Sequence, residues 1–132
     1  MSASTDQSTA VFGVEFAAPM PGLSPHTTFT LEQIDGAEGL HALRATDADL
    51  RLFLLDPRSG DYGYEPGIPA DARSEIGASD DSEIRVFVVA NPSADGVYIN
   101  LRAPVLIHGE SGRAAQVILE DQRYPIRARL GA

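Results

Sequence analysis

The chain of 132 residues is long enough for one domain, and its 43% apolar and 22% charged residues are typical of a globular protein. The absence of cysteine excludes a disulfide scaffold, a thiolate metal site and a thiol nucleophile. A formal net charge of −9 disfavours direct nucleic-acid binding, and no apolar run approaches the roughly 20 residues of a membrane span, so we expect a cytoplasmic protein without a membrane partner.

The N-terminal half of the sequence predicts a tail followed by short strands. Residues 1–10 are rich in Ser and Thr and have almost nothing to bury, which predicts a disordered tail before a single domain at 11–132. From Phe12 onward, apolar residues alternate with polar ones or gather in short runs, each ended by Pro, Gly or Asp. These patterns predict strands near 12–16, 29–31, 40–43 and 50–55.

The middle of the chain predicts one helix and a hairpin. Residues 58–67 have loop chemistry and include two tyrosines, whereas 69–76 can form two helical turns with Pro69 at the first turn and Gly77 after the last. The valine-rich run 84–90 predicts a strand. The loop at 91–96 ends in Asp-Gly, so the chain is expected to return antiparallel at 97–101.

Proline interrupts the next apolar run. Pro104 cannot donate to a strand ladder, so a bend is expected there, and further strands are expected at 115–119 and 124–130. Ile126, Ala128 and Leu130 should share one face of the last strand. Eight or more short strands predict an all-β fold: a small antiparallel β-barrel or sandwich-like single domain with at most one short helix.

The residues offer no visible catalytic or metal site. The three histidines are far apart in the sequence, and a chain without lysine cannot form a Schiff base. The crowded carboxylates Asp80, Asp81 and Glu83 resemble a solvated loop, because nothing apolar surrounds them to raise a pKa. We therefore predict no enzyme, no cofactor and no metal.

The charge is unevenly distributed. Residues 1–96 hold five arginines against 16 acidic residues, whereas 97–132 hold five arginines against three. The acidic half is a candidate surface for a basic partner, although acidic loops that simply keep the protein soluble are an equally good interpretation.

The last third carries a specific resemblance. The run NLRAPVLI at 100–107, followed by AQVIL at 115–119 and by Tyr124, resembles the flagellar assembly factor FliW family, which has an Asn-Leu-x-Ala-Pro run, an apolar strand and a Gln-Val strand. Earlier pieces fall in the same order, among them Glu15-Phe16, Pro21-Gly22-Leu23, Phe29, 40–43, 52–57 and Tyr62. The resemblance covers roughly residues 11–130.

The resemblance implies a protein-binding regulator without enzymatic activity. Members of the family are small β-barrel-like proteins that bind flagellin and the translational repressor CsrA. It implies that newly made flagellin occupies the factor, and that export of flagellin frees the factor to bind CsrA and relieve the repression of flagellin synthesis. An acidic antagonist suits a repressor that needs a basic surface for RNA.

Eight residues are candidates for partner binding. Pro21, Gly22 and Leu23, with Tyr62 and Tyr64, would form a loop surface with apolar anchors, and core packing of Leu23 and Tyr62 is the alternative. For Asn100, Pro104 and Gln116, the alternative is structural: the two amides would satisfy backbone groups around the Pro104 bend.

Two rival functions remain open. A small β-barrel hydrolase would need a deep polar pocket with two converging carboxylates. A ligand-binding barrel would need an apolar cavity in its interior.

Overall fold

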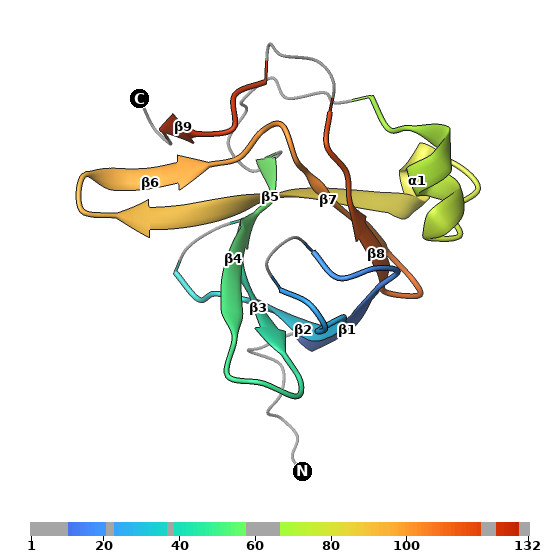
Figure 1. Ribbon diagram of the computed structural model, residues 1–132, viewed down its shortest axis with the longest axis horizontal. Helices are drawn as coiled ribbons and strands as arrows, with labels where there is room; N and C mark the ends of the chain where they lie inside the picture. Colours follow the sequence, from blue (N-terminus) through green and yellow to red (C-terminus); the bar gives the residue numbers. More distant parts are fainter. Residues whose placement is uncertain (1–10, 21–22, 37–38, 58–66, 120–123, 130–132) are drawn as a thin grey trace.

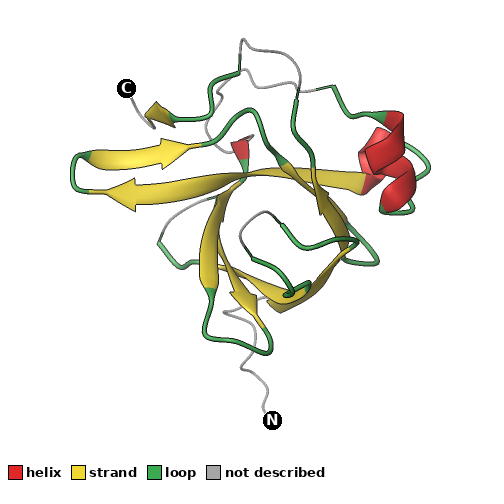
Figure 2. Ribbon diagram, viewed as in Figure 1, coloured by secondary structure: helices red, strands yellow, loops and turns green. Residues whose placement is uncertain are grey.

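The computed structural model describes residues 11–20, 23–36, 39–57, 67–119 and 124–129. They form one sheet of nine strands, seven of which close into a barrel through the β4–β5 pair, with one short α-helix (Figures 1 and 2). The predicted all-β fold is therefore confirmed. The tail predicted at 1–10 lies outside the described residues.

The first four strands form an antiparallel meander. They are β1 (Val11–Phe16), β2 (Thr28–Gln33), β3 (Leu40–Ala45) and β4 (Arg51–Leu55), close to the four predicted positions. Alternate side chains point into the barrel, so Leu31 and Leu43, which are opposite each other in the register, are both buried.

The second half supplies β5 (Ile84–Ser93), β6 (Gly96–Ile99), β7 (Val105–His108), β8 (Arg113–Gln116) and β9 (Ala128–Arg129). The chain bends between β6 and β7, before Val105, as the proline predicts. The strand expected at 115–119 begins and ends earlier. The strand expected at 124–130 is limited to two residues within the described part of the chain.

The hairpin loop predicted at 91–96 is shorter than expected, because β5 continues through Pro92 to Ser93. The N–H of Asn100 donates to the carbonyl of Val89, so ladder bonds fall on the odd-numbered residues of this part of β5. Pro92 then occupies a non-hydrogen-bonded position, and its missing N–H breaks no bond to β6.

One pair departs from the expected antiparallel arrangement. β1 and β8 are parallel, with Glu15 opposite Arg113 and Phe16 opposite Ala114. Just before β8, Gly112 has a φ of +80°, and a Cβ there would lie 2.1 Å from the carbonyl oxygen of Gly13. Glycine therefore allows the strands of this pair to approach each other.

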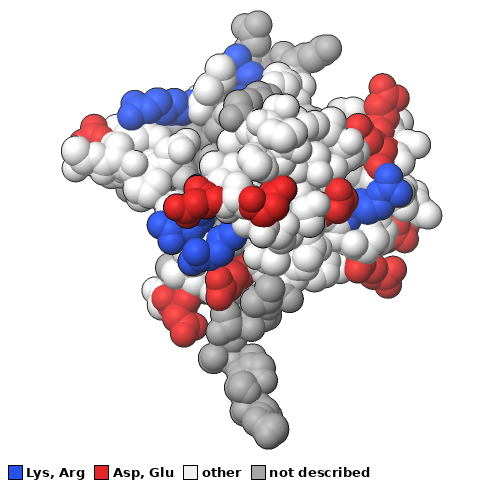
Figure 3. All heavy atoms as spheres, turned by 60° about the horizontal axis from the view of Figure 1, so that its bottom comes forward, with Lys and Arg blue, Asp and Glu red and all other residues white. Residues whose placement is uncertain are grey.

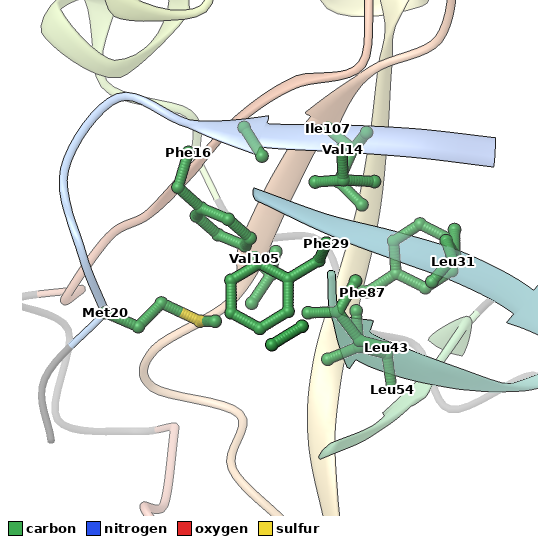
Figure 4. Packing of buried hydrophobic residues seen from close by; sticks show 12 residues of the cluster. Val14, Phe16, Met20, Phe29, Leu31, Leu43, Leu54, Phe87, Val105 and Ile107 are labelled. Atoms are coloured by element: carbon green, nitrogen blue, oxygen red, sulfur yellow. The ribbon is translucent and has the colours of Figure 1, made fainter. Parts of the chain in front are cut away.

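The barrel interior is filled by one hydrophobic cluster. Its twelve buried members come from the barrel strands and from Met20, and Phe16 and Phe29 meet edge to face at 5.5 Å between ring centroids (Figure 4). Close packing of these side chains occupies the interior, where a ligand-binding barrel would need its cavity.

Two further clusters lie outside the barrel. Helix α1 (Ala70–Glu75) follows Pro69 and ends before Gly77, as predicted, and it packs Ala72 against the outer faces of β5, β7 and β8. A third cluster covers the outer face of β4, β5 and β6. The β5–β6 hairpin and α1 extend from opposite sides of the barrel (Figure 1).

No helix in the described ranges is long and apolar enough to cross a membrane.

Candidate functional site: an apolar groove beside the β5–β6 hairpin

A groove of about 460 Å³ lies between the barrel and the β5–β6 hairpin. Aliphatic side chains and three side-chain amides dominate it, and Arg127 is the single charged residue among the described residues that line it. The lining comprises Met20, Leu23, Leu52, Val89, Asn91, Tyr98, Ile99, Asn100, Ala103, Gln116, Ile118, Ile126 and Arg127. We call this surface the groove.

The structure brings three of the eight candidate residues together here. Leu23, Asn100 and Gln116 all line the groove, although they are far apart in the sequence. Leu23 also packs partly buried against the interior cluster, and Pro104 is fully buried. Pro21, Gly22, Tyr62 and Tyr64 lie outside the described residues.

The amides at the groove hold the chain bend in place. The Asn100 Oδ1 atom accepts the N–H groups of Arg102 at 3.0 Å and Ala103 at 3.1 Å. The Gln116 Nε2 atom donates to the carbonyl of Ala103 at 3.1 Å. The structural interpretation of these two side chains is therefore confirmed, and their contact with a partner stays a prediction.

The chain after residue 123 forms one wall of the groove. The Arg127 guanidinium lies 3.5 Å from the centre of the Tyr98 ring, and Arg129 donates to the carbonyl of Asp95 at 2.7 Å. Two backbone carbonyls of this segment also accept bonds, Pro125 from the Leu101 N–H at 3.0 Å and Tyr124 from the Arg102 Nε at 2.8 Å. These contacts fix the segment against β6.

Sequence reasoning missed the exposed apolar part of the groove. Ile118 is 67% exposed and Ile126 is 60% exposed. Alternation predicts that Ile126 lies in the last strand, but within the described residues the antiparallel pairing with β6 includes only Ala128 and Arg129. Nothing in the local pattern distinguishes these isoleucines from core residues.

The carboxylates near α1 have structural partners. Asp80 accepts hydrogen bonds from the hydroxyl and the N–H of Ser82, and these bonds lower its pKa. Glu83 accepts the Ser79 N–H at 2.7 Å and lies 3.5 Å from Nε2 of His108. A raised pKa, which a general acid would need, does not arise at Asp80.

His108 is likewise engaged, because its Nδ1 accepts the N–H groups of Glu110 and Ser111 in the β7–β8 turn. Within the described ranges, no three His, Cys, Asp or Glu side chains gather as a metal site would require. Nor does any carboxylate of those ranges line the groove, so it lacks the converging pair that the hydrolase alternative expects.

Comparison with known proteins gives one consistent result. The family model described as "FliW protein" matches residues 2–130. The flagellar assembly factor FliW of Thermosipho africanus is 27% identical over 121 residues, which cover 89% of this chain and 83% of that protein. The protein of the same name from Symbiobacterium thermophilum is 29% identical over 117 residues, covering 86% and 85%.

A solved structure supports the same fold. The crystal structure of a flagellar assembly factor FliW superimposes with a TM-score of 0.81. The match covers 89% of this chain and 84% of that one, at 22% sequence identity.

Proposed function

Since the chain belongs to the FliW family of flagellar assembly factors, we propose that it works by binding proteins: it binds flagellin and antagonises the translational repressor CsrA. Membership of the family, which extends over residues 2–130, is the observation that carries the proposal. In this proposal the protein acts in the cytoplasm and couples the export of flagellin to its synthesis.

The charge of the molecule supports a basic partner such as an RNA-binding repressor. Acidic side chains gather at the end of the molecule that carries α1, whereas basic side chains gather near β9, and both kinds occur between them (Figure 3). On and after α1, Asp71, Glu75 and Asp80 are exposed. An acidic surface accelerates encounter with a basic protein and repels RNA, so it can release RNA without covering the RNA site.

The filled barrel and the open groove support protein binding rather than small-molecule chemistry. The interior is packed with aliphatic and aromatic side chains, while the groove is on the surface and accessible to a partner's side chains. Interfaces between proteins are commonly anchored by a few apolar side chains in such hollows.

A calorimetric titration tests the proposal. CsrA from the same organism is titrated into the protein, and the titration is repeated with flagellin already bound. Saturable binding of CsrA that flagellin abolishes is the expected result. If neither CsrA nor flagellin gives heat, and neither co-elutes with the protein in gel filtration, the proposed function is wrong.

Salt dependence tests the electrostatic part separately. The association rate with CsrA should fall when the ionic strength rises from about 50 mM to about 500 mM, because screening shortens the range of the acidic field. An association rate that ignores salt would contradict the electrostatic argument and leave binding itself intact.

A further inference from the structure

We infer that the groove binds an aliphatic segment of flagellin that carries a carboxylate, with Arg127 as its ion-pair partner, and that the basic repressor binds outside the groove. The inference rests on the proposed function and adds to it which surface each partner uses and what chemistry the flagellin segment has.

The apolar part of the argument comes from exposure. Ile118 and Ile126 are the large hydrophobic side chains that the structure leaves exposed among the residues it describes, and both line the groove. A single exposed aliphatic residue is ordinary, but two in one hollow beside Leu23 and Met20 indicate a contact surface. A partner that covers them must bring aliphatic side chains.

The charge of the groove selects among apolar partners. The chain carries −9 overall, yet no carboxylate of the described residues lines the groove. Its one charged residue is Arg127, whose guanidinium carbon lies over the Tyr98 ring at 3.5 Å from the ring centre. Stacking leaves the in-plane N–H donors of an arginine able to form a bidentate pair with a carboxylate.

Asp95 is the nearby acidic residue to consider. Its carboxylate accepts the hydroxyls of Ser93 at 2.7 Å and Tyr98 at 2.9 Å. These two bonds are the main reason that its pKa is lowered, and the charge of Arg127 contributes less. In the described part of the chain, no carboxylate forms an ion pair with Arg127. Its charge is therefore suited to a carboxylate that the partner supplies.

The same charge disfavours a basic partner in the groove. A positively charged surface placed against Arg127 would meet repulsion, with no acidic side chain in the groove lining to offset it. Helix α1, on and after which exposed carboxylates follow in the chain, lies across the molecule from the β5–β6 hairpin (Figure 1). Charge thus gives the two partners different contact residues. The exclusion of CsrA by bound flagellin then comes from the bulk of the two partners around this small barrel, and not from shared contact residues.

The experiment is a set of titrations with flagellin and, separately, with CsrA. The groove variants are Ile118→Gln, Ile126→Gln and Arg127→Glu. Two controls match them on another face, Ile34→Gln and Arg44→Glu, since both residues line a separate hollow on the outer face of β2, β3 and β4. Urea unfolding of each variant checks that the fold is retained, since Ile34 is half-buried and the other four positions are exposed.

Each groove variant should weaken flagellin binding by about tenfold or more, because burial of an aliphatic side chain or a desolvated ion pair is lost. The same variants should bind CsrA within about twofold of the wild type, and the controls should bind both partners normally. Arg127→Glu should give the largest loss, because it opposes the partner's carboxylate.

Three results would overturn the inference. Flagellin that binds all groove variants as tightly as the wild type would place its site elsewhere, and the proposed function would stand. Equal loss of both partners in the groove variants would show one shared surface. A wild-type protein that binds no flagellin would refute the proposed function itself, and this inference with it.

Discussion

Replacing Gly112 with alanine should separate β1 from β8, the parallel pair of strands in the barrel. Gly112 is buried, has a φ of +80° and directly precedes β8. A Cβ at this position would lie 2.1 Å from the carbonyl oxygen of Gly13 and 3.2 Å from its carbonyl carbon. The obstacle is backbone, so it cannot be relieved by rotating a side chain. β1 and β8 must move apart by about 1 Å to restore van der Waals contact.

The expected cost follows from two terms. A non-glycine residue in the left-handed region costs about 1–2 kcal/mol. Moving the strands apart weakens two backbone bonds, Glu15 N–H to Gly112 O at 2.9 Å and Ala17 N–H to Ala114 O at 3.0 Å. Each contributes about 1 kcal/mol. We therefore expect Gly112→Ala to lower the free energy of unfolding by about 3–4 kcal/mol.

Urea unfolding followed by far-ultraviolet circular dichroism measures this loss. Gly36→Ala is the matched control, because Gly36 has a φ of +81° and no atom lies within 4 Å of the place that an alanine Cβ would take. It should lose only the conformational term of about 1–2 kcal/mol. Equal destabilisation by the two substitutions would refute the claim that close approach of β1 to β8 depends on glycine.

Three further predictions concern the bend and a buried histidine. Asn100→Ala should lower the free energy of unfolding by about 2 kcal/mol in urea, because two N–H groups lose their acceptor. The control Asn91→Ala, at an exposed residue of the groove, should change the free energy of unfolding by less than about 0.5 kcal/mol. Equal effects would contradict the structural role of Asn100. Pro104→Ala should lower the free energy of unfolding by about 2 kcal/mol, because buried packing is lost and the unfolded chain gains conformational entropy. Unchanged thermal stability and unchanged partner binding would show that Pro104 matters little for the bend. Burial lowers the pKa of the His41 imidazole below its ordinary value of 6.5, so the unfolded chain binds a proton at this residue more readily than the folded chain. The contribution of neutral His41 to stability is therefore present above pH 6.5 and is lost as the pH falls through the folded-state pKa. His41→Gln should therefore show a smaller fall in unfolding free energy than the wild type between about pH 7 and about pH 5, and identical slopes would contradict this.

Much of the local structure follows from patterns that lie close together in the chain. Alternation predicts β1 to β3, and a short apolar run predicts β4. A proline before a short polar run with a glycine after it predicts α1. Pro104 predicts the bend because a residue without an N–H cannot continue a ladder. The hydrogen bonds of Asn100 and Gln116 follow from the same reasoning, since buried backbone groups near a bend need partners.

The extent of β9 and the exposure of its neighbour Ile126 could not be predicted in this way. Alternation identifies which residues share a face of a strand, but it does not identify whether another element covers that face. Beyond β6 nothing in the described structure packs over Ile126, so it remains exposed although its sequence context resembles that of a core strand.

The sequence by itself determined the all-β class, the one helix, the position of the bend and the family. Each of these depends on residues within a few positions of one another, or on a sequence motif that can be recognised without the tertiary structure. Only the tertiary structure decided that β1 joins β8 in parallel and that Leu23, Gln116 and Arg127 meet in one groove. Those contacts join residues about a hundred positions apart. Local propensity does not indicate which distant strands pair, because the pairing depends on how the whole sheet closes and buries its faces.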